Sequence, residues 1–227
     1  MRPVRDLLLI GAGGFARETA EAVRAINAAE LRWALRGFLD DSPGLQGTDI
    51  AGVPIVGPID SVHDHPGAAL VICTGRPDNY VSRRIIAERL GFGDDHYATL
   101  IHPSATLGDT CQVGAGTVLL AHVDLTADVV VGRHVAVMPQ VVLTHDVVVE
   151  DFATLGSGVR VGGTARIAQG AYIGSGAHLR EGVMVGERAM IGMSAVVVDD
   201  VPAERLWYGA PARDMDRAPI PQPQAAE

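Results

Sequence analysis

Residues 131–149 read VGRHVAVMPQVVLTHDVVV, with an aliphatic residue at every sixth position of this stretch. The same spacing holds without a gap from residue 101 to residue 197, where each such position is Leu, Ile or Val. A period of six fits neither an α-helix nor a coiled coil, but it is typical of short strands separated by turns. The repeat therefore predicts a β-helix in which three six-residue units form one triangular coil.

A second set of small or β-branched residues stands two positions before the aliphatic ones, for example Cys111, Val129 and Ala165. Because strand side chains alternate, both sets should face the inside of the prism, where successive coils stack about 4.8 Å apart. Gly often follows the aliphatic residue, as at Gly132 and Gly156, and it suits a tight corner. The second half of the chain should thus have an aliphatic core.

The chain has 227 residues, 48% of them hydrophobic, and a net charge of −9, which indicates a globular protein. An acidic chain is a poor partner for nucleic acid, because phosphate contacts need a basic face. No apolar run approaches the roughly 18 residues of a membrane span, and the run at residues 7–10 is too short for a signal peptide. Cys73 and Cys111 lie in different segments, so we expect a cytoplasmic protein without disulfides.

The first part of the chain begins with a short apolar run that ends in Gly11, Gly13 and Gly14, and a helical pattern follows. A strand, a glycine turn and a helix in this order let a phosphate approach backbone N–H groups at the positive end of the helix. A tight turn with no ligand would use the same residues. About 95 residues precede the β-helix, too few for the two-halved dinucleotide fold, so we expect a single mononucleotide-binding half rather than an NAD-linked enzyme.

A second predicted strand ends in the paired acids Asp40 and Asp41. Such acids can accept hydrogen bonds from sugar hydroxyls, an amino group or a base, but a solvated turn explains them equally well. We assign residues 1–96 to a small Rossmann-like α/β domain, residues 97–213 to the β-helix and residues 214–227 to a flexible tail. The six-residue pattern begins almost at once after the first domain, so the two domains should hold a fixed relation.

His145 departs from the small or acidic residues that fill most predicted corners of the β-helix. Gly163 stands one coil later and should lie beside it. An imidazole takes and releases a proton near neutral pH, and a backbone N–H at a glycine can reach an oxyanion. The arrangement favours His145 as a general base at the mouth of a groove, although a solvated corner histidine would have the same spacing.

These residues and their order resemble the NeuD/PglD family of sugar acetyltransferases over nearly the whole chain. The matching segments are residues 10–18 (IGAGGFARE), 37–41 (GFLDD), 101–103 (IHP), 144–146 (THD) and 209–213 (GAPAR). The resemblance implies a Rossmann-like domain that holds a nucleotide-linked sugar and a left-handed parallel β-helix that holds acetyl-CoA. It also implies a homotrimer with each active site between two subunits.

The resemblance further implies roles for single residues. His145 matches the catalytic histidine, Asp146 the acid beside it, and Gly163 the glycine whose amide faces the thioester carbonyl. The implied acetyl-CoA contacts are Ser175, Met193 and Arg213, and the implied sugar-nucleotide contacts are Gly11, Gly13, Gly14, Phe15, Asp40 and Asp41. Some family members carry His where this chain has Phe15 and Thr154, so the acceptor contacts should differ.

Neither a metal site nor a covalent intermediate is expected. His122, His134 and His145 do not have the spacing of the zinc carbonic anhydrases built on hexapeptide repeats, and cysteine ligands are lacking. We interpret His134 as a surface or subunit-interface residue. No G-x-S-x-G motif is present, which favours direct transfer over an acyl-enzyme.

The sequence thus predicts an acyltransferase that moves an acetyl group from acetyl-CoA to the amino group of a nucleotide-linked amino sugar. Two alternatives stay open at this point. One is O-acetylation of sialic acid or another sugar, and the other is a non-catalytic scaffold that binds nucleotide sugars.

Overall fold

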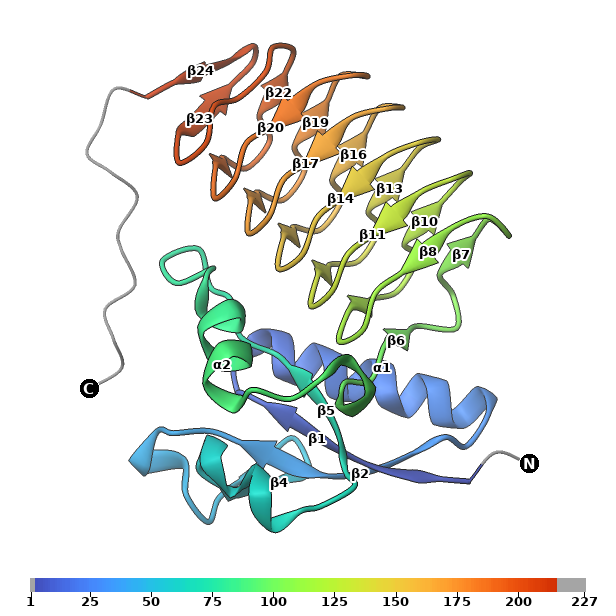
Figure 1. The fold of residues 1–227 in the computed structure, drawn as a ribbon, viewed down its shortest axis with the longest axis vertical. Coiled ribbons are helices and arrows are strands. Elements are labelled where there is room, and N and C mark those ends of the chain that lie inside the picture. Colours follow the sequence, from blue (N-terminus) through green and yellow to red (C-terminus); the bar gives the residue numbers. More distant parts are fainter. Residues whose placement is uncertain (1–2, 216–227) are drawn as a thin grey trace.

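The computed structural model of the chain describes residues 3–215 and divides into an α/β domain and a β-helix (Figure 1). The α/β domain is built on a sheet in the order β3-β4-β2-β1-β5, in which β3 pairs antiparallel with β4 and the other pairs are parallel. Its main elements are β1 (Arg5–Ile10), α1 (Gly14–Ala29), β2 (Trp33–Leu39), β3 (Asp49–Ile50), β4 (Val53–Gly57), β5 (Ala69–Ile72) and α2 (Ser82–Leu90). Short 3₁₀ helices lie in the connections: η1 (Pro43–Leu45), η2 (Ile59–Asp64) and η3 (Asp94–His96).

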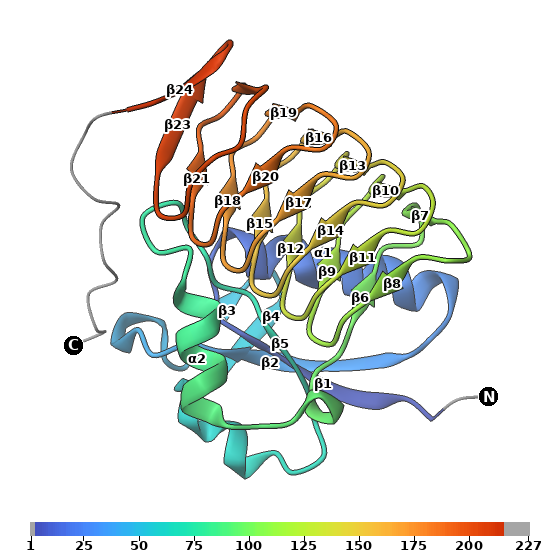
Figure 2. The ribbon, with the colours of Figure 1, turned by 45° about the horizontal axis from the view of Figure 1, so that its top comes forward.

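Helix α1 lies between this sheet and the first coils of the β-helix (Figures 1 and 2). Its apolar side chains recur at helical spacing, and Val23 and Ile26 are buried in one cluster with Leu9 of β1. Val118 and Leu120 of the β-helix belong to the same cluster. The two domains therefore share a hydrophobic core, which fixes how they sit relative to each other.

The β-helix has three faces, which we number in chain order. Face 1 contains β6 (Leu100–Ile101), β9 (Val118–Leu119), β12 (Ala136–Val137), β15 (Thr154–Leu155), β18 (Tyr172–Ile173), β21 (Met190–Ile191), β23 (Leu206–Gly209) and β24 (Ala212–Asp214). Face 2 contains β7 (Thr106–Leu107), β10 (Asp124–Leu125), β13 (Val142–Leu143), β16 (Arg160–Val161), β19 (His178–Leu179) and β22 (Val196–Val197). Face 3 contains β8 (Gln112–Val113), β11 (Val130–Val131), β14 (Val148–Val149), β17 (Arg166–Ile167) and β20 (Met184–Val185).

Each strand pairs in parallel with the strand one coil away. Leu143, for example, is in register with Leu125 on one side and Val161 on the other. From residue 117 onward both sets of inward residues are buried, as shown by Leu143 and by Val141 two positions before it, whereas those of the first coil are partly exposed. The β-helix and its core, predicted from the period of six, are confirmed.

The carboxyl end of the β-helix is closed by the antiparallel pair β23 and β24. Asp214, which the sequence placed in the flexible tail, is the last residue of β24. The rest of the predicted tail from residue 216 onward lies outside the described residues. No helix within residues 3–215 has the length and apolar content needed to cross a membrane.

The corner between faces 3 and 1 is covered by the α/β domain. His134 lies at this corner and is only 4% exposed, with its ring stacked on Phe152 at 5.1 Å and edge-on to Tyr97 at 4.4 Å. The interpretation of His134 as a surface residue is therefore wrong. The reason is tertiary, because Tyr97 precedes the β-helix in sequence and folds back over a corner formed much later in the chain.

Candidate active site

His145 lies in the turn between β13 on face 2 and β14 on face 3. Leu143 fills the prism at the end of β13, so the following residues leave the core and turn the corner, where Asp146 has a φ of 60°. The side chains of His145 and Asp146 are 63% and 58% exposed. This corner thus presents an imidazole and a carboxylate together at the surface.

A hydrogen bond joins Nδ1 of His145 to Oδ2 of Asp146 at 2.8 Å. Because a carboxylate can only accept, Nδ1 carries the proton in this contact, and the lone pair of the neutral ring is then on Nε2. The carboxylate therefore selects the tautomer in which Nε2 can take a proton from a ligand. Because the two residues are adjacent, the sequence alone does not show whether their side chains meet.

Gly163 lies against the same imidazole in the next coil. A Cβ added at Gly163 would lie 2.4 Å from Nε2 of His145, so any side chain there would displace the ring. The N–H groups of Gly162 and Thr164 donate to Leu179 O and His145 O, respectively. Within residues 3–215 no acceptor takes the N–H of Gly163, which leaves a backbone donor beside the imidazole.

Ser175 and Met193 lie one coil apart on a different corner, between faces 1 and 2. Both are exposed, Met193 by 77%. Face 2 separates this corner from the corner of His145, and its six residues per coil span up to ~20 Å when extended. One chain therefore brings His145, Asp146 and Gly163 together but does not bring the predicted acetyl-CoA contacts to them.

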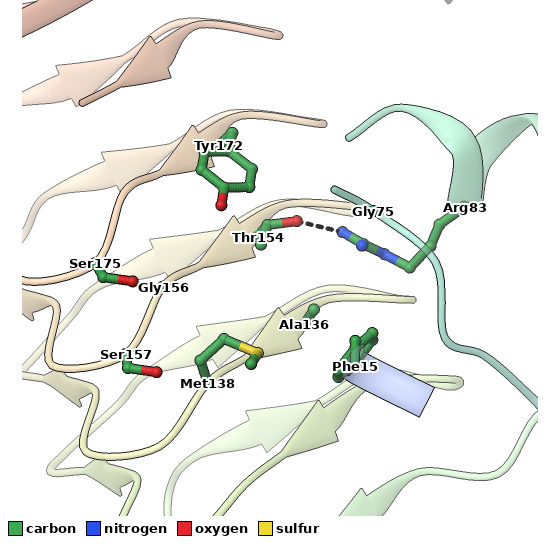
Figure 3. Close-up of a pocket in the computed structure, with 10 residues that line it drawn as sticks. All are labelled: Phe15, Gly75, Arg83, Ala136, Met138, Thr154, Gly156, Ser157, Tyr172 and Ser175. Carbon is green, nitrogen blue, oxygen red and sulfur yellow. Dashed lines mark hydrogen bonds between the residues drawn. The ribbon is translucent and has the colours of Figure 1, made fainter. Parts of the chain in front are cut away.

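A cavity of about 130 Å³ lies between the α/β domain and face 1 (Figure 3). Phe15 in the first turn of α1 borders it on one side, and Thr154 and Tyr172 point outward from face 1 on the other. Ser157 and Ser175 also line it, so the cavity reaches the corner between faces 1 and 2. The two positions for which altered acceptor contacts were expected, Phe15 and Thr154, thus face one space.

Arg83 of α2 lines the same cavity and was not predicted from the sequence. Its side chain is 1% exposed and bridges the two domains. The sequence feature that could have identified Arg83 is its spacing from Ile86 and Leu90, which places all three residues on the buried face of α2. An arginine on a buried helix face is unusual enough to mark a site.

The glycine turn lies between β1 and α1. Gly11 is required by packing, because it has a φ of 97° and an added Cβ would lie 2.8 Å from Cγ2 of Thr74. Gly13 and Gly14 instead face open space. Helix α1 begins at Gly14 without a side-chain cap and without an acid in its first turn, so its N-terminal N–H groups are available to an anion.

The paired acids are engaged by the protein itself. Asp40 accepts hydrogen bonds from the backbone N–H groups of Ala12 and Ser42, both at 2.9 Å. Asp41 accepts one from Arg89 at 2.8 Å. These contacts brace the glycine turn and the loop after β2, and a substrate contact of either acid stays a prediction.

Two further expectations concern the end of the β-helix and metal ions. Arg213 on β24 is exposed and lies 3.4 Å from Asp199, so its guanidinium is held at the surface of the last coil. Among residues 3–215, no three His, Cys, Asp or Glu side chains are grouped so that they could hold a metal ion.

Known proteins share this architecture over nearly the whole chain. The acetyltransferase domain of PglB from Neisseria gonorrhoeae FA1090, solved with acetyl coenzyme A, matches with a TM-score of 0.83 and 29% identity over 94% of this chain and 100% of that chain. PerB from Caulobacter crescentus, solved with CoA and GDP-perosamine, matches with a TM-score of 0.81 and 25% identity over 94% of this chain and 98% of that chain.

A curated relative matches over a shorter segment. UDP-N-acetylbacillosamine N-acetyltransferase of Bacillus subtilis (strain 168) is 43% identical over 56 residues, which are 25% of this chain and 24% of that protein. The match thus spans about a quarter of the relative's length. No protein-family model matches the chain.

Proposed function

The chain belongs to the NeuD/PglD family of sugar acetyltransferases with a left-handed parallel β-helix, and on that premise we propose that it acetylates a nucleotide-linked amino sugar with acetyl-CoA. The observation that carries the proposal is the contact of His145 with Asp146 and Gly163 at one corner of the β-helix. This contact supplies a base and a backbone donor side by side, which an acyl transfer needs and a mere scaffold does not.

In the proposed reaction, the acceptor nitrogen attacks the thioester carbonyl and passes its proton to Nε2 of His145. Asp146 holds the ring in the tautomer that can take this proton and stabilises the imidazolium that forms. The N–H of Gly163 donates to the oxyanion, a contribution of about 3 kcal/mol for a well-placed donor. The proton then moves to the leaving sulfur, and no covalent acyl-enzyme is formed.

The acceptor sugar is proposed to occupy the cavity between the α/β domain and face 1. The glycine turn at Gly13 and Gly14, with the open N-terminus of α1, supports binding of the diphosphate on the same side. Phe15 lies in the first turn of the same helix and lines the cavity, so a sugar attached to that diphosphate would extend toward Thr154 and Tyr172. Acetyl-CoA would follow the corner of Ser175 and Met193 and end at the cavity.

A second copy of the chain is proposed to complete the site. The cavity and Ser175 lie on one edge of face 2, whereas His145 lies on the other edge. If copies pack side by side through their β-helices, the His145 corner of one copy can lie against the Ser175 corner of its neighbour. Contacts of this head-to-tail kind close into a ring when the rotation between copies allows it, and we propose a ring of three, a homotrimer with three shared sites.

The direct test is release of free thiol from acetyl-CoA with a panel of nucleotide-linked amino sugars and the matching hydroxy sugars. We expect release only with the amines, and an acetamide product by mass spectrometry. Release only with hydroxy sugars would assign O-acetylation instead. Absence of both thiol release and acetyl-CoA binding in calorimetry would support the scaffold.

A further inference from the structure

Arg83 is a buried cation whose hydrogen-bond partners within residues 3–215 are all neutral. Nε donates to His134 O at 2.9 Å, and Nη1 donates to Thr74 O at 2.6 Å. Nη2 donates to Phe152 O, Ala153 O and Thr154 Oγ1. Burial lowers the pKa of the Arg83 guanidinium to about 10, so it stays charged at neutral pH.

The titratable groups that face Arg83 do not neutralise it. Burial raises the pKa of the Cys73 thiol to about 12 and raises the pKa of the Tyr172 hydroxyl, so both are uncharged at neutral pH. Burial, then the charges of Arg133 and Arg83, lower the pKa of His134 to about 4, so the imidazole is uncharged too. No carboxylate within residues 3–215 bonds to Arg83.

Other arginines at the same domain junction are paired with carboxylates. Arg84 bonds to Glu88 at 2.8 Å, and Arg133 bonds to Asp151 at 2.7 Å. Arg83 differs from both in lacking such a partner and in lining the cavity. The wall of the cavity therefore carries an uncompensated positive charge, and in a buried site this charge acts over several ångströms with little screening.

The hydroxyl of Thr154 adds a possible hydrogen-bond donor beside the charge of Arg83. Its oxygen accepts a hydrogen bond from Nη2 of Arg83 at 2.7 Å, so the hydroxyl can still act as a donor, and Thr154 lines the cavity. The dashed line in Figure 3 marks this bond, with Tyr172 in the strand above. The charge of Arg83 disfavours a cation in the cavity, and the Thr154 hydroxyl favours a group that accepts a hydrogen bond.

An acceptor amine that reaches this cavity as an ammonium ion has no lone pair for attack. We infer that the positive charge of Arg83 holds the acceptor amine in its neutral, nucleophilic form. The ammonium releases its proton to solvent, and the nitrogen lone pair then forms the C–N bond while the C–S bond breaks. The proton lost on attack passes through His145 to the thiolate, so atoms and charge balance. The inference rests on the proposed N-acetylation. It concerns a residue that acts by its field from the corner between faces 3 and 1, whereas the base lies at the corner between faces 2 and 3.

The test is the pH dependence of kcat with saturating acetyl-CoA and amine acceptor, because kcat reports groups in the ternary complex. Arg83→Gln should move the acidic limb of the profile to higher pH by roughly 1 to 2 units, as expected for removal of a nearby like charge. Arg83→Lys keeps the charge and should leave the limb at its wild-type position even if the rate falls. Arg84→Gln removes a charge from the same helix turn but outside the cavity, and its limb should not move. An unmoved limb in an active Arg83→Gln protein would overturn the inference.

A second measurement covers the case in which Arg83→Gln does not fold. The wild-type protein is saturated with CoA and an acceptor labelled with nitrogen-15 at the amine, and the amine is titrated by NMR. The bound amine should lose its proton at least one pH unit below the free sugar, and a bound value equal to or above the free value would overturn the inference. If the wild-type protein acetylates no amine in the thiol assay, the proposed function is wrong and this inference fails with it.

Discussion

Two histidines of the β-helix lie in contact with a glycine one coil away, yet their surroundings are opposite. His145 lies against Gly163, is largely exposed and bonds to Asp146. His134 lies against Gly116, is buried, and its Nδ1 has no hydrogen-bond partner among the described residues. The repeat supplies the same kind of notch at both corners, and the α/β domain covers only one of them. Contact with the second domain thus separates a residue suited to chemistry from a residue that packs a junction.

The sharpest test of this contrast is His145→Ala. We expect kcat to fall by ~10² to 10⁴, the usual contribution of a general base, while KM for acetyl-CoA stays close to wild type. Because the side chain is exposed, the free energy of unfolding should change by less than about 0.5 kcal/mol. Steady-state kinetics and urea denaturation measure the two effects. Wild-type turnover with the true acceptor would show that His145 is not the base.

The buried histidine should instead control stability against acid. His134 titrates near 6.5 in the unfolded chain, whereas in the fold burial lowers its pKa to about 4. Between these values the unfolded state binds the extra proton, so stability is lost as the pH falls from about 6.5 to about 4, by up to ~3 kcal/mol. Urea denaturation at pH 7.5 and pH 5 measures the loss.

The matched control for this prediction is His134→Leu, which cannot titrate. It should be less stable than wild type at pH 7.5, but its loss between pH 7.5 and pH 5 should be smaller. Equal losses in the two proteins would show that the burial of His134 does not set the acid sensitivity.

Gly163→Ala tests the notch beside His145 directly. The added Cβ would lie 2.4 Å from Nε2, so the ring must move, and a displacement of about 1 Å costs roughly 10- to 100-fold in kcat. Gly44→Ala is the control, because Gly44 faces open space and does not have a positive φ. Equal activity of the two variants would show that the position of the His145 ring against Gly163 does not matter for catalysis.

The smallest effect is expected from mixing two inactive proteins. His145→Ala and Ser175→Trp damage opposite edges of face 2, so a mixed oligomer would contain interfaces with both edges intact. After subunit exchange, activity should recover to about a quarter of wild type, since random assortment leaves roughly one interface in four intact. Each variant taken through the same exchange procedure alone should stay inactive. No recovery despite proven exchange would place both residues in a site within one chain.

The candidate site was predictable only where it lies within the repeat. The spacing from His145 to Gly163 equals one coil, so their contact followed from sequence, whereas the direct bond of His145 to Asp146 is seen only in the structure. Arg83 and Tyr172 were not found, because they line one cavity only through the packing of α2 and the segment before it on face 1, which no local pattern encodes. Asp40 and Asp41 show the opposite difficulty. Acids at a strand end look available in sequence, but in the structure Asp40 is bonded to Ala12 in the glycine turn and Asp41 to Arg89 of α2.

The sequence by itself determined the β-helix, its inward residues and the corner that holds His145, because each coil repeats the same short-range alternation of buried and exposed positions. Only the tertiary structure decided which corner stays open, which arginine is buried without a carboxylate, and where the two edges of face 2 lie. Those outcomes depend on segments distant in the chain that exclude water from one surface and leave another exposed, and hydrophobic burial of that kind is non-directional and leaves no period in the sequence.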